Sequence, residues 1–171
     1  MKPLVVTSSM TSMNGVFYPT GHVFALFKDE AAARQAFDAL QQAQYQGTVA
    51  HADPVRIQKE ITHTVEGSDN TMPSAGADDD IVRRIGDLAS RGYHGLLIEL
   101  GDSDKIESVQ SVVDAHHAEA AFYYRTFIIE ELVEQPKNLD SNAVSGTHAP
   151  GAHPTNGSSE NQPPTEIRRG H

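Results

Sequence analysis

The first half of the chain alternates an apolar run with an amphipathic one. Residues 22–27 are apolar on both faces, which is typical of a central strand covered by helices. Asp29 follows at a position where it can cap a helix, and apolar side chains then recur at helical spacing: Ala33, Ala36, Phe37, Leu40 and Ala43. Gln46 and Gly47 end this pattern. The sequence therefore predicts a strand–helix unit and a second strand over residues 48–52.

The segment after the second strand fits two structures. Val55, Ile57 and Ile61 suit an alternating strand. Asp53 and Pro54, followed by the same two isoleucines, suit a short capped helix instead. Of the two, we expect a strand over residues 55–64.

A further helix and strand follow in the second half. Asp78–Asp80 offer caps and negative charge at a helix N-terminus, where the helix dipole favours them. Ile81, Ile85 and Leu88 form the apolar stripe of this helix, and Gly92 is suited to end it. Residues 95–100 then form the clearest strand pattern in the chain.

The last two predicted elements are a helix and a long strand. Asp104 and Glu107 have the spacing of a capping box, and helical apolar spacing continues from there to His116. Residues 120–132 are rich in Phe, Tyr and Ile, which predicts one long strand.

This order of elements predicts an α+β fold. A ferredoxin-like four-stranded sheet with helices packed on one face accommodates it, if the helix over residues 80–91 is an insertion before the third strand. A doubly wound parallel sheet is the alternative. We expect residues 1–21 to be an irregular N-terminal segment and residues 22–132 to be the domain. Residues 66–77 and 133–171 have the composition of a mobile loop and a disordered tail.

Composition narrows the partners. The formal net charge of −10 and a pI near 5.2 argue against nucleic-acid binding, which depends on Lys and Arg. The chain has no Cys, which excludes disulfides, thiolate nucleophiles and iron–sulfur clusters. No apolar run approaches the roughly 20 residues of a membrane helix, and the N-terminus does not resemble a secretory signal. We expect a cytoplasmic protein with no cofactor and no membrane partner.

Nine His residues raise the question of a metal or ligand site. His116 and His117 are adjacent, so on a helix they point about 100° apart and cannot chelate one ion. His51, His63 and His94 stand near predicted strand ends, and the fold could bring them together. If the chain binds a small molecule, these three are the candidate ligand-binding residues, and we expect no metal centre.

Motifs for catalysis are missing. The chain contains no GxGxxG, GxxxxGK[ST] or GxSxG sequence. Residues 101–104 follow a predicted strand where phosphates often bind, but their two carboxylates would repel a phosphate. We therefore expect a protein that is not an enzyme.

Two segments pair a strand, an acidic turn and a helix in a recognisable way. They read GHVFALFKDEAAARQAFDALQQA and RGYHGLLIELGDSDKIESVQSVVDAHHA. In this arrangement the chain resembles the bacterial general-stress, heat-induced YflT-like family over about residues 22–125. It departs from the family at residues 44–47 and at His116-His117. The resemblance implies a small α/β domain linked to stress physiology and brings no catalytic residues with it.

Two functions follow as hypotheses. The first is a non-enzymatic, stress-associated protein that self-associates, because a small ferredoxin-like sheet often leaves a strand edge and an apolar face to be covered. Tyr123, Phe127 and Ile129, on one face of the predicted last strand, would form the interface of a homo-oligomer. The alternative is a regulatory module that responds to a small molecule or a metal, with its ligand near His51, His63 and His94.

Overall fold

The computed structural model describes residues 1–66, 76–101 and 106–133, which form an α+β fold around a six-stranded sheet. In chain order the strands are β1 (Lys2–Pro3), β2 (His22–Phe27), β3 (Val49–Ala52), β4 (His94–Glu99), β5 (Ala120–Tyr124) and β6 (Ile129–Glu131). Their order in the sheet is β1-β3-β4-β2-β5-β6. β1 and β3 are parallel and the other neighbouring pairs are antiparallel, so the sheet is mixed.

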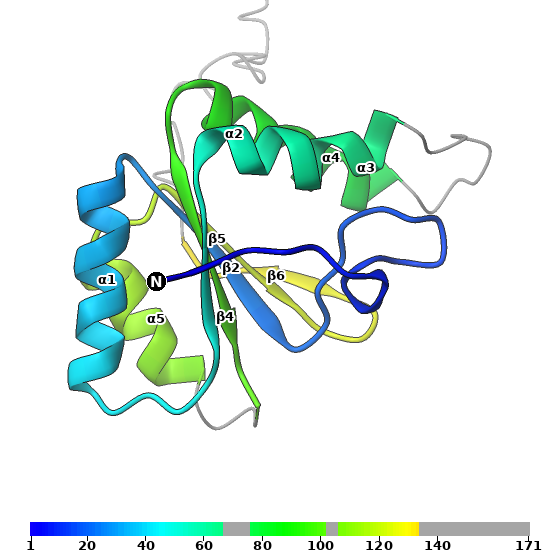
Figure 1. The fold of residues 1–171 in the computed structure, drawn as a ribbon. Coiled ribbons are helices and arrows are strands. Elements are labelled where there is room, and N and C mark those ends of the chain that lie inside the picture. Colours follow the sequence, from blue (N-terminus) through cyan, green and yellow to red (C-terminus); the bar gives the residue numbers. More distant parts are fainter. Residues whose placement is uncertain (67–75, 102–105, 134–171) are drawn as a thin grey trace, which may run out of the picture. The chain divides into compact units, whose positions relative to one another are not determined.

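One face of the sheet is covered by α1 (Glu30–Gln42) and α5 (Ile106–Ala115), as Figure 1 shows. The Asp29 side chain accepts a hydrogen bond from the Ala32 amide and so caps α1. The buried side chains of this layer come from both helices and from alternate strand positions, among them Val23, Ala33, Leu40, Leu96, Ile98, Val109 and Val113. The strand–helix units expected around residues 22–43 and 95–116 are therefore present.

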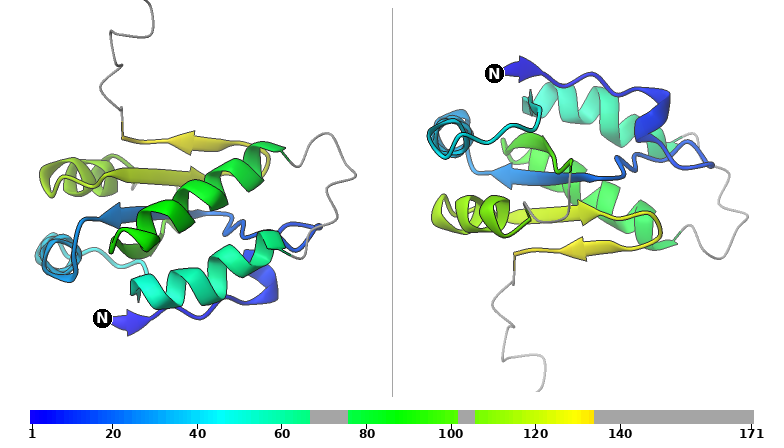
Figure 2. Two further views of the ribbon diagram at one scale, coloured as in Figure 1. Left: turned by 90° about the horizontal axis from the view of Figure 1, so that it is seen from above. Right: turned by 90° about the horizontal axis from the view of Figure 1, so that it is seen from below.

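The opposite face is covered by a second group of helices. These are α2 (Pro54–Arg56), the π-helix η2 (Ile57–Thr62), α3 (His63–Glu66) and α4 (Gly76–Ser90). Figure 2 shows α4 beside the continuous run from α2 to α3 across this face. None of the described helices is long and apolar enough to cross a membrane.

The strand expected over residues 55–64 is wrong, because this segment is helical. The Asp53 side chain accepts a hydrogen bond from the Arg56 amide, and Pro54 occupies the first turn, where a missing amide hydrogen costs nothing. Ile57 and Ile61 are four residues apart, and both are fully buried in the core that α4 and the sheet also form. Helical burial of these two side chains outweighs the apparent alternation with Val55, which is exposed.

Two glycines let these layers approach closely. A Cβ atom at Gly86 of α4 would lie 3.0 Å from the Thr62 hydroxyl oxygen of η2. The Gly86 carbonyl also accepts a hydrogen bond from the Gln58 side chain at 2.6 Å. A Cβ atom at Gly95 of β4 would collide with the Phe24 ring of the neighbouring strand. Gly86 therefore allows the close approach of α4 and η2, and Gly95 leaves room for the Phe24 ring on the face that these helices cover.

The sheet differs from the expected four strands with helices on one face. It has six strands, and helices cover both faces. The long strand expected over residues 120–132 is a hairpin, because β5 ends at Tyr124 and β6 starts at Ile129, antiparallel to it. The N-terminal segment also joins the core, where Leu4, Val16 and Phe17 are buried.

Two expectations cannot be compared with the structure over most of their length. The mobile loop expected over residues 66–77 falls largely outside the described residues, and so does the disordered tail expected over residues 133–171.

Candidate functional site

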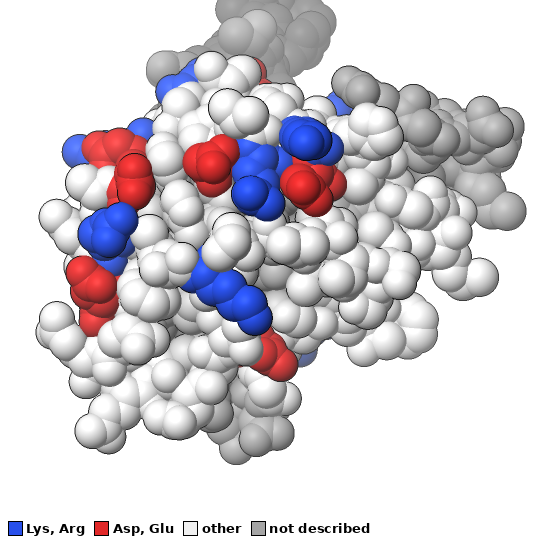
Figure 3. Space-filling model, viewed as in Figure 1, with Lys and Arg blue, Asp and Glu red and all other residues white. Residues whose placement is uncertain are grey.

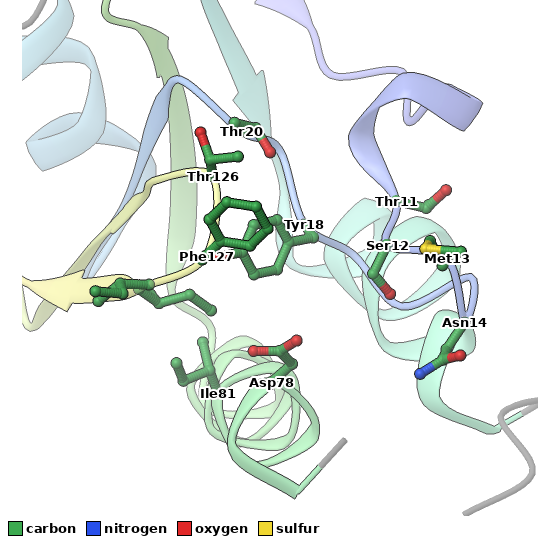
Figure 4. A pocket seen from close by; sticks show the side chains of 12 residues that line it. Thr11, Ser12, Met13, Asn14, Tyr18, Thr20, Asp78, Ile81, Thr126 and Phe127 are labelled. Atoms are coloured by element: carbon green, nitrogen blue, oxygen red, sulfur yellow. The ribbon is translucent and has the colours of Figure 1, made fainter. Parts of the chain in front are cut away.

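A cavity of about 790 Å³ lies beside the turn that joins β5 to β6. Its described walls come from three places: the N-terminal segment before β2, the first turns of α4, and the hairpin turn itself (Figure 4). Tyr18 and Phe127 supply aromatic walls, Met13 and Ile81 supply aliphatic ones, and Asp78 supplies a carboxylate. Small-molecule sites have volumes of about 300–1,000 Å³ and this mixture of apolar walls with few polar groups.

The hairpin turn presents apolar side chains to solvent. The Arg125 amide donates a hydrogen bond to the Ile128 carbonyl at 2.9 Å, which closes the turn. Phe127 is 92% exposed and Ile128 is 66% exposed at its tip, and Met13 is fully exposed across the cavity. Large apolar side chains gathered at one solvent-facing place indicate a binding surface.

The N-terminal segment beside this turn carries little charge. No Lys, Arg, Asp or Glu occurs between Lys2 and Lys28. Figure 3 shows charged side chains over the helices and one Lys or Arg near the middle of this face, whereas the right-hand part of the described surface below the helices is white. A ligand in the cavity would therefore meet Asp78 as its main electrostatic partner.

Two carboxylates stand in the first turns of α4. Asp78 lines the cavity and is partly buried; burial and the neighbouring Asp79 raise the pKa of the Asp78 carboxyl above its usual value. Asp79 is only 3% exposed, and its Oδ1 atom has no hydrogen-bond partner among the described residues. This end of α4 therefore concentrates negative charge that nearby described side chains do not neutralise.

A pair of tyrosines lies close to these carboxylates. The rings of Tyr18 and Tyr124 meet edge to face, with centroids 5.4 Å apart. The Tyr18 hydroxyl donates a hydrogen bond to the Arg125 carbonyl at 2.8 Å. The Tyr124 hydroxyl is fully buried and has no partner among the described residues. Burial, together with Asp78 and Tyr18, raises the pKa of the Tyr124 phenol far above its usual value, so the hydroxyl keeps its proton.

Two of the three predicted ligand-binding histidines meet. His51 Nε2 and His94 Nδ1 are 3.0 Å apart, and the rings stack with centroids 5.3 Å apart and planes at 15°. The register of β3 and β4 sets His51 opposite Leu96, so His94 lies two residues away on the same face. Burial, and then His94, lowers the pKa of His51, which favours the neutral form of the His51 ring.

The third histidine does not join them. His63 begins α3, in the helical layer on the opposite face of the sheet, and its side chain is exposed. Within residues 1–66, 76–101 and 106–133, no group of three or more His, Asp or Glu side chains could hold a metal ion. The three histidines therefore do not form the common ligand site that their positions in the sequence suggested.

The three predicted interface residues do not share a face. Tyr124 pairs with Ile129 in the hairpin, so these two side chains lie on the face covered by α4, and Ile129 packs against that core. Tyr123 lies on the other face and is buried against the α1 and α5 layer. Phe127 is in the turn. Only Phe127 and Ile129, which both line the cavity, remain together.

The cavity itself was not predicted. Asp78 had been interpreted as a helix cap, and Tyr18 lay in a segment expected to be irregular. The available signal was the long stretch without charged residues before Lys28, in which Met13, Phe17 and Tyr18 stand among Ser, Thr and Asn.

Comparisons with known proteins give no identity. No family model matches the chain, no curated protein matches it, and no solved structure matches it. The resemblance to the general-stress family therefore remains a prediction, and function has to be argued from the cavity.

Proposed function

We propose that this chain is a non-enzymatic binding module that holds a small organic molecule in the cavity beside the β5–β6 turn. The observation that carries the proposal is the cavity of about 790 Å³, which combines apolar and aromatic walls with one partly buried carboxylate. Apolar walls supply affinity, and a few polar groups fix the orientation of a ligand.

The chemistry of the walls favours binding over catalysis. Among the described lining residues there are several hydroxyls, such as those of Thr11 and Thr20, but no His, Lys or Arg. A hydroxyl nucleophile needs an adjacent base, and no hydrogen bond joins either of these threonine side chains to Asp78. The wall therefore offers groups that recognise a ligand without an activated nucleophile.

Native mass spectrometry of the full chain, purified gently from its own host, tests the proposal. We expect a stoichiometric added mass. Thr20 lines the cavity and is exposed, so Thr20→Trp should place a large side chain in the cavity, obstruct the ligand and abolish the added mass without disturbing the core. Ser111→Trp, at an exposed position of α5 on the other side of the sheet, is the matched control and should keep it.

Two results would count against this function. One is a wild-type chain that carries no added mass and shows no thermal shift with a panel of small organic compounds. A ligand at a hundredfold excess over its dissociation constant should add about 2.7 kcal/mol to the free energy of unfolding, which a thermal shift detects. The other is an added mass that Thr20→Trp leaves unchanged.

Self-association is the second candidate function. It is favoured by Phe127 and Ile128, exposed at the hairpin tip next to β6, which lies at the end of the described strand order. An edge strand has one row of unpaired backbone groups, and beside apolar side chains this row can pair with a second copy. The stress-associated role and the cytoplasmic location implied above accompany either candidate as hypotheses, and protein levels before and after heat shock test the first of them.

The finer fold assignment is also a proposal. The four central strands have the order β3-β4-β2-β5, and α1 and α5 connect parallel strands across an antiparallel neighbour. This order supports a ferredoxin-like core that β1, β6 and the second helical layer extend. An experimental structure with a different strand order would refute it.

A further inference from the structure

The cavity has one charged side chain in its described wall. This is Asp78, in the first turns of α4, and its carboxylate projects toward Tyr18 and Phe127 in Figure 4. The carboxyl groups of Asp78 and Asp79 are adjacent, and both are at least partly withdrawn from water. Two such groups repel each other, and a positive charge placed at Asp78 would relieve that repulsion.

Nearby cations of the chain do not supply this charge. Arg125 pairs with Glu130 at 3.0 Å and lies over the ring of Tyr123, which faces the other helical layer. Arg84 pairs with Glu131 at 2.8 Å and lies over the ring of Phe122. Both guanidinium groups are therefore paired with the glutamates of β6, and Arg84 Nη2 is itself buried without a hydrogen-bond partner among the described residues.

Two buried polar groups near the cavity wall also support a ligand in this cavity. The Tyr124 hydroxyl and Asp79 Oδ1 are buried without hydrogen-bond partners among the described residues. Leaving such a group unpaired in the interior costs free energy, so each one in a folded protein calls for an explanation. Tyr124 contacts Tyr18, which lines the cavity, and the Asp79 carboxylate is close enough to Asp78 to raise its pKa, so both unpaired groups lie near the residues of this wall.

We propose that the cavity selects small organic cations, namely amines with an aromatic or aliphatic body, whose charged nitrogen pairs with Asp78 while the body lies between Tyr18 and Phe127. This inference rests on the proposed binding function. Aromatic faces and a carboxylate together are the usual recognition elements for such amines. The net charge of −10 also concentrates cations near the molecule and repels anions.

Three compounds that share an indole body test the charge selectivity. They are tryptamine, which is a cation at neutral pH, tryptophol, which is neutral, and indole-3-acetate, which is an anion. Binding of each to the ¹⁵N-labelled full chain is followed by NMR titration at one fixed salt concentration, which gives both affinity and location. We expect tryptamine to bind at least about tenfold more tightly than the other two, which corresponds to about 1.4 kcal/mol. The amide shifts should centre on Asp78, Ile81 and Phe127.

A pair of variants separates the role of Asp78 from general electrostatics. Asp78→Asn should weaken tryptamine binding about tenfold and leave tryptophol binding within about twofold. Asp80→Asn removes the same charge from an exposed position in the same helix and should leave both affinities unchanged. Equal loss in the two variants would assign the effect to long-range charge and overturn the site.

The outcomes distinguish this inference from the function on which it rests. If tryptophol or indole-3-acetate binds in the cavity as tightly as tryptamine, the binding module stands and the selectivity for cations is refuted. If none of the three compounds shifts the cavity amides at millimolar concentration, the proposed function fails as well.

Discussion

The rings of Tyr124 and Tyr18 are in contact, but only one of the two hydroxyls has a hydrogen-bond partner among the described residues. Tyr124 is fully buried and its hydroxyl has no partner within residues 1–66, 76–101 and 106–133, whereas Tyr18 donates to the Arg125 carbonyl at 2.8 Å. An unpaired buried hydroxyl lowers the free energy of unfolding, whereas a hydrogen-bonded hydroxyl raises it. We therefore predict that Tyr124→Phe raises the free energy of unfolding by about 1 kcal/mol, and that Tyr18→Phe lowers it by about as much.

Urea denaturation of the two variants, each compared with the wild-type chain, measures both changes. The same ring remains in each variant, so packing is conserved and the sign reports the hydroxyl alone. Destabilisation by Tyr124→Phe equal to that of Tyr18→Phe would mean that the Tyr124 hydroxyl is satisfied in solution. The unpaired Tyr124 hydroxyl would then no longer support a ligand site in the cavity.

The hydrogen bond between His51 and His94 predicts a pH dependence of stability. Burial and His94 lower the pKa of His51 below its usual value near 6.5. As the pH falls through 6.5, the unfolded chain therefore binds a proton that the folded chain does not. The contribution of neutral His51 to the free energy of unfolding is therefore fully present above pH 6.5. It is lost as the pH falls from there toward the pKa of His51 in the folded chain.

His51→Gln removes the imidazole that binds this proton in the unfolded chain, and it keeps a side-chain amide near the position of Nε2. We predict that the free energy of unfolding falls less between pH 7.5 and pH 5.5 in His51→Gln than in the wild-type chain, as measured by urea denaturation. His63→Gln, at an exposed position on α3, is the control and should follow the wild-type curve. Parallel curves for all three proteins would show that His51 titrates as it does in the unfolded chain.

At the scale of elements, the sequence predicted the helices and strands with clear periodicity. The stripe Ala33, Ala36 and Leu40 after a capping Asp29 is buried as expected, and so is the alternation of Leu96 and Ile98. Each of these patterns fits one period only. Local spacing therefore specified these elements without knowledge of their neighbours.

Elements that depend on tertiary contacts were predicted less well. Residues 53–66 fit both periods, and only burial of Ile57 and Ile61 against α4 selects the helix. The content of Phe, Tyr and Ile in residues 120–132 predicts one long strand, yet the Arg125–Ile128 hydrogen bond closes a turn in a segment without Gly or Pro. A turn formed without its usual residues gives no local signal.

The candidate site shows the same limit more strongly. The register of β3 and β4 joins His51 to His94, and their positions near strand ends made this pairing predictable. The cavity joins residues as distant as Tyr18, Asp78 and Phe127, which no spacing rule connects. Asp78 has the same local sequence whether it only caps a helix or also faces a ligand, so its second role could be seen only in the structure.

At the scale of the whole molecule, charge and apolar surface are separated. The chain carries a net charge of −10, yet the N-terminal stretch between Lys2 and Lys28 has no charged residue and forms one wall of the cavity. An acidic molecule with one apolar, weakly charged surface repels its own copies at long range and attracts them at that surface. The balance between these two effects decides whether the chain associates, and it depends on salt, since screening weakens only the repulsion.

Phe127 gives the direct test of association through this surface. It is 92% exposed at the hairpin tip, so replacing it removes apolar surface and leaves the core intact. We predict that the wild-type chain elutes as a homo-oligomer in size-exclusion chromatography with light scattering, more completely at higher salt, and that Phe127→Asp elutes as a monomer. Val55→Asp, at an exposed valine of α2 away from the hairpin, is the matched control and should keep the wild-type mass.

A ligand that fills the cavity would compete with association, because both need Phe127, so tryptamine should shift the wild-type chain toward the monomer. A wild-type monomer at all salt concentrations, or an oligomer that Phe127→Asp does not dissociate, would exclude this surface as the interface.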